Sequence, residues 1–289
     1  MSFADRRAAL AARVRARELT VAPGVFDLVS ARIADQAGFD ALYMTGYGVS
    51  ASRMGLPDAG LTSFADMVDQ ARRLAAATSR PLIADADTGF GGLLNVRHTV
   101  EGYEAAGVAA IQLEDQEFPK KCGHAEGRRV IDTADMVKKV EVAVDSRTSD
   151  DVLIIARTDA RSSLGLIEAI ARGQAYADAG ADLVFVESPE TEDEFARIAA
   201  EIDAPLVANM VEGGFSPMLS TDRLAALGYT VALFPTMGLF AATAAMQSAY
   251  ATLHSDGMSP GSDELMPIGD MHTLMGFDDV WSFDERWAD

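Results

Sequence analysis

The segment from Lys120 to His124 has the residue types most able to do chemistry in this sequence, because it contains the chain's single cysteine. Lys120 and Lys121 precede Cys122, and Gly123 and His124 follow it. Cationic neighbours lower the pKa of a thiol, and a glycine frees the backbone. A lone cysteine is also often a small buried hydrophobe. These polar and flexible flanks instead predict a mobile loop, in which Cys122 is a candidate catalyst.

Carboxylates form a second group of chemically suggestive residues. Asp85 and Asp87 are two residues apart at the end of an apolar run, so we expect them to project to the same side. Glu114 ends another run, and Asp58 lies in a loop. Converging carboxylates repel one another unless a cation is bound, and such oxygen ligands suit Mg2+. The alternative is that Asp87 only begins a turn and Asp58 is an ordinary loop residue.

Polar residues follow the other apolar runs at corresponding points. Arg157 can clamp a carboxylate with paired donors, whereas Glu187 and Asn209 can orient a second polar group. Any one of them alone could be a structural hydrogen-bonding residue, so their common position is the informative feature. The segments are Thr45-Gly46-Tyr47-Gly48, Arg157-Thr158-Asp159, Glu187-Ser188-Pro189, Asn209-Met210-Val211-Glu212-Gly213-Gly214 and Pro235-Thr236.

The elements that position these residues are visible as eight short runs rich in Val, Ile and Leu, each followed by a stretch with helical spacing. Runs apolar on both faces fit a parallel sheet with crossover helices. Eight units predict an α/β fold, a closed (β/α)8 TIM barrel with reacting groups at the carboxyl ends of its strands. An open doubly wound sheet is the alternative, but no Gly-x-Gly-x-x-Gly follows the first strand. The predicted strands are residues 20–25, 41–45, 81–86, 109–114, 152–157, 183–187, 205–209 and 230–234, and the predicted helices are 26–37, 63–77, 94–106, 133–146, 164–179, 191–202, 221–227 and 239–255.

Length and composition fit one large core. The 289 residues, 49% of them hydrophobic, suffice for a barrel of roughly 250 residues. A formal net charge of -20 opposes nucleic acid or an anionic membrane as a partner. One cysteine excludes an internal disulfide framework, and no run reaches the roughly 20 apolar residues of a membrane span or looks like a signal peptide. The sequence therefore predicts a cytoplasmic protein.

The last part of the chain, residues 259–289, is rich in Met, Phe and Trp. An apolar tail of this kind docks more often than it stays free. We therefore expect residues 1–289 to form a single barrel domain, in which residues 259–289 are an oligomerisation extension that packs on a neighbouring subunit.

Four motifs carry a resemblance to a known family. They are Met54-Gly55-Leu56-Pro57-Asp58, the Asp-x-Asp-x-Gly-x-Gly run from Asp85 to Gly91, Glu114-Asp115-Gln116, and the Lys-Lys-Cys-Gly-His run from Lys120 to His124. In these motifs, and over nearly its whole length, the chain resembles the isocitrate lyase and phosphoenolpyruvate mutase superfamily. The resemblance implies a (β/α)8 barrel, a C-terminal helix swapped between the subunits of a homotetramer, a Mg2+ ion and a gating loop that contains the cysteine.

The resemblance also implies residue roles. Asp85 would touch the metal directly, and the groups holding its waters would be Asp58, Asp87 and Glu114. Arg157 matches the clamp of the α-oxo carboxylate, which Thr45, Gly46 and Tyr47 would also bind. The residues assisting Cys122 would be Lys120, Lys121 and His124. The remaining substrate-binding candidates are Gly123, His124, Glu187, Asn209, Glu212 and Pro235.

The loop sequence separates branches of the superfamily. Mutases and phosphonopyruvate hydrolases carry Asn-Ser-like residues where this chain has Cys122-Gly123-His124, which argues against phosphorus chemistry. Members that act on isocitrate or methylisocitrate have His at the position of Gln112. The stretches from Asn209 to Gly214 and from Phe118 to Cys122 look closer to petal death protein and the 2,3-dimethylmalate lyases. The chain as a whole resembles the lyase branch near these two and methylisocitrate lyase. Oxaloacetate hydrolases of that branch carry Ser where this chain has Pro235.

Together these features predict a Mg2+-dependent carbon-carbon lyase, with Mn2+ as a substitute metal. It would cleave a 2-hydroxy-2-alkyl dicarboxylate of the 2,3-dimethylmalate or 2-methylisocitrate type to pyruvate and a smaller carboxylate, with Cys122 as the general acid. Tyr43 or a metal-bound water would take the hydroxyl proton. The alternatives are hydrolysis or decarboxylation of oxaloacetate, and a non-catalytic barrel that binds the ligand only.

Overall fold

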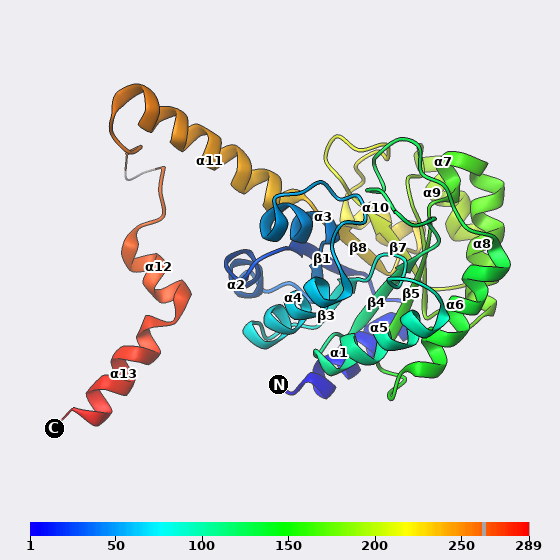
Figure 1. Ribbon diagram of the computed structural model, residues 1–289, viewed down its shortest axis with the longest axis horizontal. Helices are drawn as coiled ribbons and strands as arrows, with labels where there is room; N and C mark the ends of the chain where they lie inside the picture. Colours follow the sequence, from blue (N-terminus) through cyan, green and yellow to red (C-terminus); the bar gives the residue numbers. More distant parts are fainter. Residues whose placement is uncertain (262–263, 289) are drawn as a thin grey trace. The chain divides into compact units, whose positions relative to one another are not determined.

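The structure, a computed structural model, describes residues 1–261 and 264–288. Within them, eight parallel strands close into a barrel in chain order, with the last strand paired to the first (Figure 1). The predicted (β/α)8 barrel is confirmed, and each predicted strand is found to within a residue or two. The strands are β1 (Thr20–Val25), β2 (Leu42–Met44), β3 (Leu82–Asp85), β4 (Ala110–Glu114), β5 (Leu153–Thr158), β6 (Leu183–Val186), β7 (Leu206–Asn209) and β8 (Val231–Phe234).

Helices connect the strands and lie around the barrel (Figure 1). All predicted helices are present. Helix α1, the short helices after β2 and β5, and the two last helices were not among the predicted ones. The helices are α1 (Phe3–Arg15), α2 (Leu28–Gln36), α3 (Gly46–Val49), the π-helical turn η1 (Ser50–Met54), α4 (Phe64–Ala77), α5 (Leu93–Ala105), α6 (Thr133–Ser146), α7 (Ala160–Leu164), α8 (Leu166–Asp178), α9 (Glu192–Glu201), α10 (Thr221–Leu227), α11 (Met237–Asp256), α12 (Ile268–Met275) and α13 (Phe277–Trp287).

Helix α1 covers the amino-terminal end of the barrel. Its Leu10, Ala11 and Val14 are buried in one cluster with strand residues such as Ala22 and Ile83, which line the barrel interior. Apolar packing therefore closes this end. The polar side chains of the interior lie at the carboxyl ends of the strands, where barrels of this type hold their active sites.

Side-chain alternation along the strands determines which residues face the interior. Ile83 in β3 and Ile155 in β5 belong to the interior cluster. Asp85 and Arg157 lie two residues further along, so they face the same way. The register pairs Glu114 of β4 with Arg157 of β5. Polar residues thus stand at the last inward-facing position of their strands, as the sequence predicted.

A capping box fixes the end of the loop that carries Asp58. The Ser63 hydroxyl accepts a hydrogen bond from the Asp66 N–H at 3.3 Å, and the Asp66 carboxylate accepts one from the Ser63 N–H at 3.0 Å. This reciprocal pair satisfies the first turn of α4. The loop between η1 and α4 is consequently anchored at a defined point.

The chain divides into two compact units, and the boundary in the sequence falls between Leu239 and Phe240. Within the second unit, the Phe277 ring packs against His272 at 4.5 Å and Trp281 at 5.8 Å. Many of its large apolar side chains are exposed, including Trp287 at 69%. Packing of this tail on a neighbouring subunit stays a prediction. Among the described residues, no helix is both long and apolar enough to cross a bilayer.

Candidate active site

The four carboxylates predicted to hold a metal converge around one ammonium group. Lys120 Nζ lies 2.5 Å from Asp58 Oδ1 and 2.6 Å from Asp87 Oδ1, and its side chain is only 3% exposed. Burial by itself lowers the pKa of Lys120, but Asp87, Asp58, Glu114 and Asp85 together hold this pKa well above its usual value. The cysteine loop therefore reaches into the carboxylate cluster through Lys120.

Negative charge in this cluster exceeds the single charge of the lysine. Burial raises the pKa of Asp87 to about 6 despite Lys120, and the nearby Asp85 and Asp58 carboxylates reinforce the shift. Burial also raises the pKa of Glu114 well above its usual value, and Glu114 Oε1 is buried without a hydrogen-bond partner. These oxygens accept and do not donate when ionised, so the cluster fits a hard divalent cation.

The fit is to a cation that keeps part of its water shell. In residues 1–261 and 264–288, no three acidic, histidine or cysteine side chains stand close enough to enclose an ion by themselves. Mg2+ commonly takes one or two carboxylates directly and completes its shell with water and substrate oxygens. The arrangement is compatible with that mode of binding.

A turn, rather than strand alternation, brings Asp85 and Asp87 together. β3 ends at Asp85, and Asp87 adopts a left-handed backbone with φ of 47°. The two carboxylates lie on the same side, as expected, but the turn at Asp87 brings them there rather than the alternation of an extended strand. The Asp87 N–H donates to Asp85 Oδ1 at 3.1 Å. A Cβ at Gly46 would lie 2.5 Å from Asp85 Oδ2 and 3.6 Å from Asp87 Oδ1, so the residue after Thr45 lies directly against the cluster.

Arg157 lies beside the cluster among three buried acidic residues. Its Nε and Nη2 donate to the two carboxylate oxygens of Asp159, each at 2.9 Å. Its guanidinium also lies 3.5 Å from Glu114 and 3.4 Å from Glu187. Asn209 donates to Glu187 at 3.0 Å, which holds that carboxylate in place. Asp159 thus orients Arg157, and a clamp on substrate rests on the donors that Asp159 does not use.

The loop that carries Cys122 lies closed over these groups. The Cys122 N–H donates to the Asp58 carbonyl at 3.0 Å. Gly123 packs against Arg157 Nη2, and a Cβ at this glycine would also lie 2.9 Å from Glu187 Oε2. Such close approach requires a glycine at this position. The loop therefore joins the carboxylate cluster to the Arg157 network.

The thiol of Cys122 is held in its protonated form. Burial raises its pKa, and Asp58 adds to this effect, although the His124 backbone N–H donates to the sulfur and opposes it. The expectation that the two preceding lysines lower this pKa is wrong. Lys120 is paired with Asp58 and Asp87, and its charge is taken up there.

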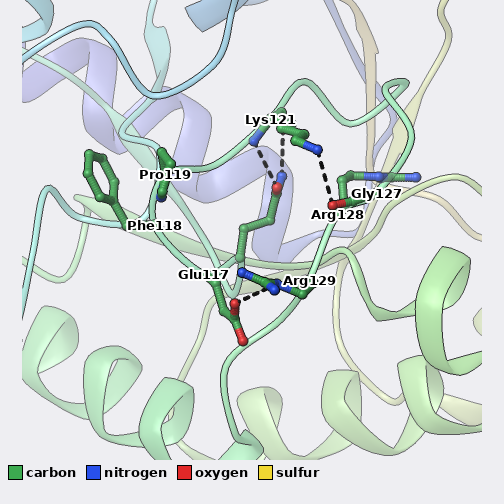
Figure 2. Close-up of a pocket in the computed structure, with 8 residues that line it drawn as sticks. Glu117, Phe118, Pro119, Lys121, Gly127, Arg128 and Arg129 are labelled. Carbon is green, nitrogen blue, oxygen red and sulfur yellow. Dashed lines mark hydrogen bonds and ion pairs between the residues drawn. The ribbon is translucent and has the colours of Figure 1, made fainter.

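Lys121 points away from the carboxylate cluster. Its Nζ donates at 3.3 Å to the carbonyls of residues 126 and 127, and its backbone is held by the Gln116 side chain. Figure 2 shows the contact of Lys121 with Gly127. The contact lies beside a cavity of about 310 Å³. Residues 116–119, 121 and 127–129 line this cavity, and none of the four clustered carboxylates does. The placement gives no support to a catalytic role for Lys121.

His124 is neutral and its tautomer follows from its contacts. The Phe215 N–H donates to Nδ1 at 3.2 Å, so we assign the ring proton to Nε2, which lies 3.6 Å from Glu187 Oε1. Burial lowers the pKa of His124, although Glu187 opposes the shift. The ring also packs on Phe215 at 5.9 Å. His124 thereby connects the cysteine loop with the segment after β7.

The other predicted residues lie around the same mouth. Tyr43 is buried, and burial together with Asp85 raises its pKa well above the usual value, so the phenol keeps its proton and is unsuited to be a base. The Thr45 hydroxyl accepts from the Gly48 N–H at 3.3 Å, which caps α3. Tyr47 is 36% exposed.

The end of β8 carries Pro235, whose backbone packs directly on Gly24. The next residue, Thr236, donates its hydroxyl hydrogen to Glu212 at 3.4 Å. Both predicted residues, Glu212 and Pro235, therefore lie at the carboxyl end of the barrel, where the Glu212 carboxylate is paired with Thr236.

Three buried polar residues of the site were given no role by the sequence analysis. Asp159 orients Arg157, Arg128 Nη1 donates to Asp159 Oδ1 at 2.7 Å, and Ser188 Oγ donates to the Gly123 carbonyl at 3.1 Å. Asp159 directly follows β5 and Ser188 lies two residues after β6, within the polar segments that the sequence analysis named. Nothing in the sequence distinguishes Arg128 from its neighbour Arg129.

These features define the class of protein: a (β/α)8 barrel whose acidic cluster lies under a loop with a buried cysteine. Residues 10–254 match the family described as phosphoenolpyruvate phosphomutase. The chain therefore belongs to the phosphoenolpyruvate mutase and isocitrate lyase superfamily, which confirms the resemblance.

Two curated relatives cover nearly the whole chain. The 2,3-dimethylmalate lyase of Eubacterium barkeri is 46% identical over 273 residues, which is 94% of each protein. The 2-methylisocitrate lyase of Halalkalibacterium halodurans is 36% identical over 267 residues, 92% of this chain and 88% of that protein. Both are named lyases, which supports the predicted carbon-carbon lyase.

Solved structures agree with this placement. A 2,3-dimethylmalate lyase structure has a TM-score of 0.91 at 38% identity, and the match covers 100% of this chain and 96% of the lyase chain. An oxaloacetate acetylhydrolase bound to 3,3-difluorooxalacetate has a TM-score of 0.93 at 36% identity, covering 98% of this chain and 97% of its own. A phosphonopyruvate hydrolase in complex with oxalate and Mg2+ has a TM-score of 0.89 at 31% identity, with full coverage of both chains.

Proposed function

We propose that this protein is a Mg2+-dependent lyase that cleaves a 2-hydroxy-2-alkyl dicarboxylate of the 2,3-dimethylmalate or 2-methylisocitrate type to pyruvate and a smaller carboxylate. The observation that carries the proposal is the position of Cys122, on a loop closed over the carboxylates and Arg157. Burial there raises the pKa of the thiol. A covalent nucleophile needs a thiolate, whereas an acid needs the proton that this thiol keeps. The two lyases among the relatives support the same reaction class.

The metal would be held by Asp85, with Asp58, Asp87 and Glu114 around it, because these acceptors gather where charge is under-neutralised. When bound, Mg2+ would supply positive charge beside the hydroxyl and carboxylate of the substrate. The phosphonopyruvate hydrolase described with Mg2+ supports this choice of ion. Mn2+ shares its preference for oxygen ligands and would substitute for it.

The chain's own residues would bind the substrate and move its protons. Arg157, oriented by Asp159, would pair with a substrate carboxylate beside the Thr45–Tyr47 segment. The closed loop would exclude water from the carbanion. In 2,3-dimethylmalate the bond between carbons 2 and 3 breaks, and carbon 2 becomes the ketone of pyruvate. Carbon 3 keeps the bonding electrons and takes the proton of Cys122, which yields propanoate. A water in the site would take the hydroxyl proton of carbon 2, because the Tyr43 phenol keeps its own proton. Return of that proton to the sulfur would restore the Cys122 thiol after the products leave.

The test is pyruvate release in the presence of Mg2+ from 2,3-dimethylmalate, 2-methylmalate and 2-methylisocitrate, with isocitrate scored by glyoxylate. We expect the first or third compound to be the best substrate and Cys122→Ser to lose most of the turnover. Full turnover by Cys122→Ser would show that another group is the acid. Absence of turnover on all of these compounds, with Mg2+ and oxalate still bound, would support a binding scaffold instead.

Oxaloacetate hydrolysis is the second candidate, because oxaloacetate acetylhydrolase structures superpose closely on this chain. Here β8 is followed by Pro235, which offers no hydroxyl, and the hydroxyl of Thr236 is directed to Glu212. This difference favours the lyase. Formation of oxalate and acetate from oxaloacetate, faster than any pyruvate release, would reverse the order of the two candidates.

A further inference from the structure

Arg128, six residues after Cys122, has the most buried cationic side chain of the cysteine loop. Its side chain is 1% exposed. Its Nη1 donates to Asp159 Oδ1 at 2.7 Å, and its Nη2 donates to Ser188 Oγ at 3.4 Å. The guanidinium carbon lies 6.0 Å from the centre of the Phe215 ring. One side chain of the loop after β4 therefore contacts the segments that follow β5, β6 and β7.

Two of these contacts lead back to the groups that the reaction needs. Asp159 Oδ1 accepts from Arg128 and also from Arg157 Nη2, so both guanidinium groups share one carboxylate oxygen. The Ser188 hydroxyl, which accepts from Arg128, donates to the carbonyl of Gly123, the residue beside Cys122. Closure of the loop and orientation of the clamp are thus built on the same atoms.

The position of Arg128 in the loop suits this connection. An antiparallel bridge between Gln116 and Val130 joins the two ends of the loop, and Arg128 lies two residues inside it. Lys120 and Cys122 bind the other limb to Asp58 and its neighbours. Without Arg128, the limb from residue 125 to residue 129 would lose its ion pair with the barrel.

We propose that Arg128 is a positioning residue: by sharing Asp159 with Arg157 and holding Ser188 against Gly123, it couples loop closure over Cys122 to the orientation of the substrate clamp. The catalytic part of this statement rests on the proposed lyase function. The conformational part does not, because closure of the loop can be measured without any substrate.

Arg129 provides a matched control. It is the next residue in the chain, carries the same charge, and is 79% exposed with an ion pair to Glu117 at 2.8 Å. Figure 2 shows the two side chains pointing in different directions from the same limb of the loop. Arg128→Met and Arg129→Met each remove one positive charge from the loop, whereas only Arg128→Met removes an ion pair with Asp159.

The single cysteine makes the experiment direct, since Cys122 is the only thiol that iodoacetamide can alkylate. Labelling without ligand compares the full-length parent protein with four variants, and mass spectrometry follows the rate. The variants are Arg128→Met, Arg128→Lys, Ser188→Ala and Arg129→Met. Because Arg128→Met removes charge-assisted hydrogen bonds, we expect its labelling to be about tenfold faster than that of the parent. Ser188→Ala should label about threefold faster than the parent. Arg128→Lys should label at a rate between those of the parent and Arg128→Met, and Arg129→Met should label at the rate of the parent.

Turnover separates this proposal from the proposed function. On the best substrate of the pyruvate-release assay, kcat of Arg128→Met should fall by about tenfold or more. Arg128→Lys should recover part of this loss, and Arg129→Met should keep the kcat of the parent. Unchanged labelling in Arg128→Met, or equal acceleration in Arg129→Met, would overturn the proposal. If Arg128→Met does not fold, labelling of Ser188→Ala and Arg128→Lys at the rate of the parent would overturn it equally. If no variant and not even the parent releases pyruvate, the lyase function fails while the labelling rates still decide the role of Arg128.

Discussion

At the scale of single residues, the state of the Cys122 proton decides what this site can do. Burial raises the pKa of the thiol above its ordinary value of 9.0. An acid catalyst works in its protonated form, and a raised pKa keeps that form present until the pH passes the folded-state pKa. We therefore predict that titration of Cys122 leaves kcat/KM unchanged up to about pH 9 and lowers it above that pH. A pH–rate profile measures this limb.

The matching variant is Cys122→Ser, which keeps a polar hydrogen but is a much weaker acid. We expect kcat to fall by about 10²- to 10⁴-fold and the alkaline limb that belongs to the thiol to disappear. The parent protein at the same pH is the control for denaturation. A profile whose activity rises with thiolate formation would contradict acid catalysis and favour a nucleophilic cysteine.

Gly46 gives a second prediction at this scale. A Cβ there would lie 2.5 Å from Asp85 Oδ2, so Gly46→Ala must displace the carboxylate expected to bind the metal. Changes that misorient a metal ligand commonly cost about 10- to 100-fold in affinity, and we expect Mg2+ binding to weaken by that factor. Isothermal titration with Mg2+ measures it. Gly92→Ala, which meets nothing within 4 Å, should bind as the parent does; equal affinity in both variants would argue against Asp85 as a ligand.

At the scale of elements, α1 supports the site from below. Leu10 is 1% exposed and packs in the cluster that fills the barrel beneath the polar mouth. We predict that Leu10→Ala lowers the free energy of unfolding by about 2–5 kcal/mol, because it leaves a cavity. Leu94→Ala is the control, since Leu94 is 78% exposed and should change stability by less than about 0.5 kcal/mol. Urea unfolding measures both, and equal stability of the two variants would show that α1 does not fill this end.

Elements also show what the sequence could and could not predict. Strands such as Ala110–Glu114 were predictable because a buried parallel strand is a short apolar run, and the polar residue at its end marks the active face. The role of Lys120 was not, because it depends on ion pairs with Asp58 and Asp87, far away along the chain. Sequence proximity assigned the charge of Lys120 to the Cys122 thiol, whereas folding assigns it to the carboxylates.

At the scale of the whole molecule, the unit that begins at Phe240 exposes more apolar surface than a stable monomer usually tolerates. No residue of α13 is buried. Its large aromatic side chains are open to solvent: Trp281, Phe283 and Trp287 are 49%, 60% and 69% exposed. Extended apolar surfaces of this kind mark protein–protein contacts. We propose that a second copy of the chain covers this helix, which agrees with the expected oligomer.

Light scattering of the full-length protein tests this arrangement. We predict a mass of several subunits for the parent, and dissociation to smaller species when Trp281 and Trp287 are both replaced by Asp, because each change buries a charge in the proposed contact. Ser282→Asp adds one such charge, half that of the double variant, to the polar face of the same helix and should keep the mass of the parent. A monodisperse monomer in the parent would contradict the oligomer outright, and dissociation by Ser282→Asp as well would show that added charge, rather than loss of the apolar face, separates the subunits.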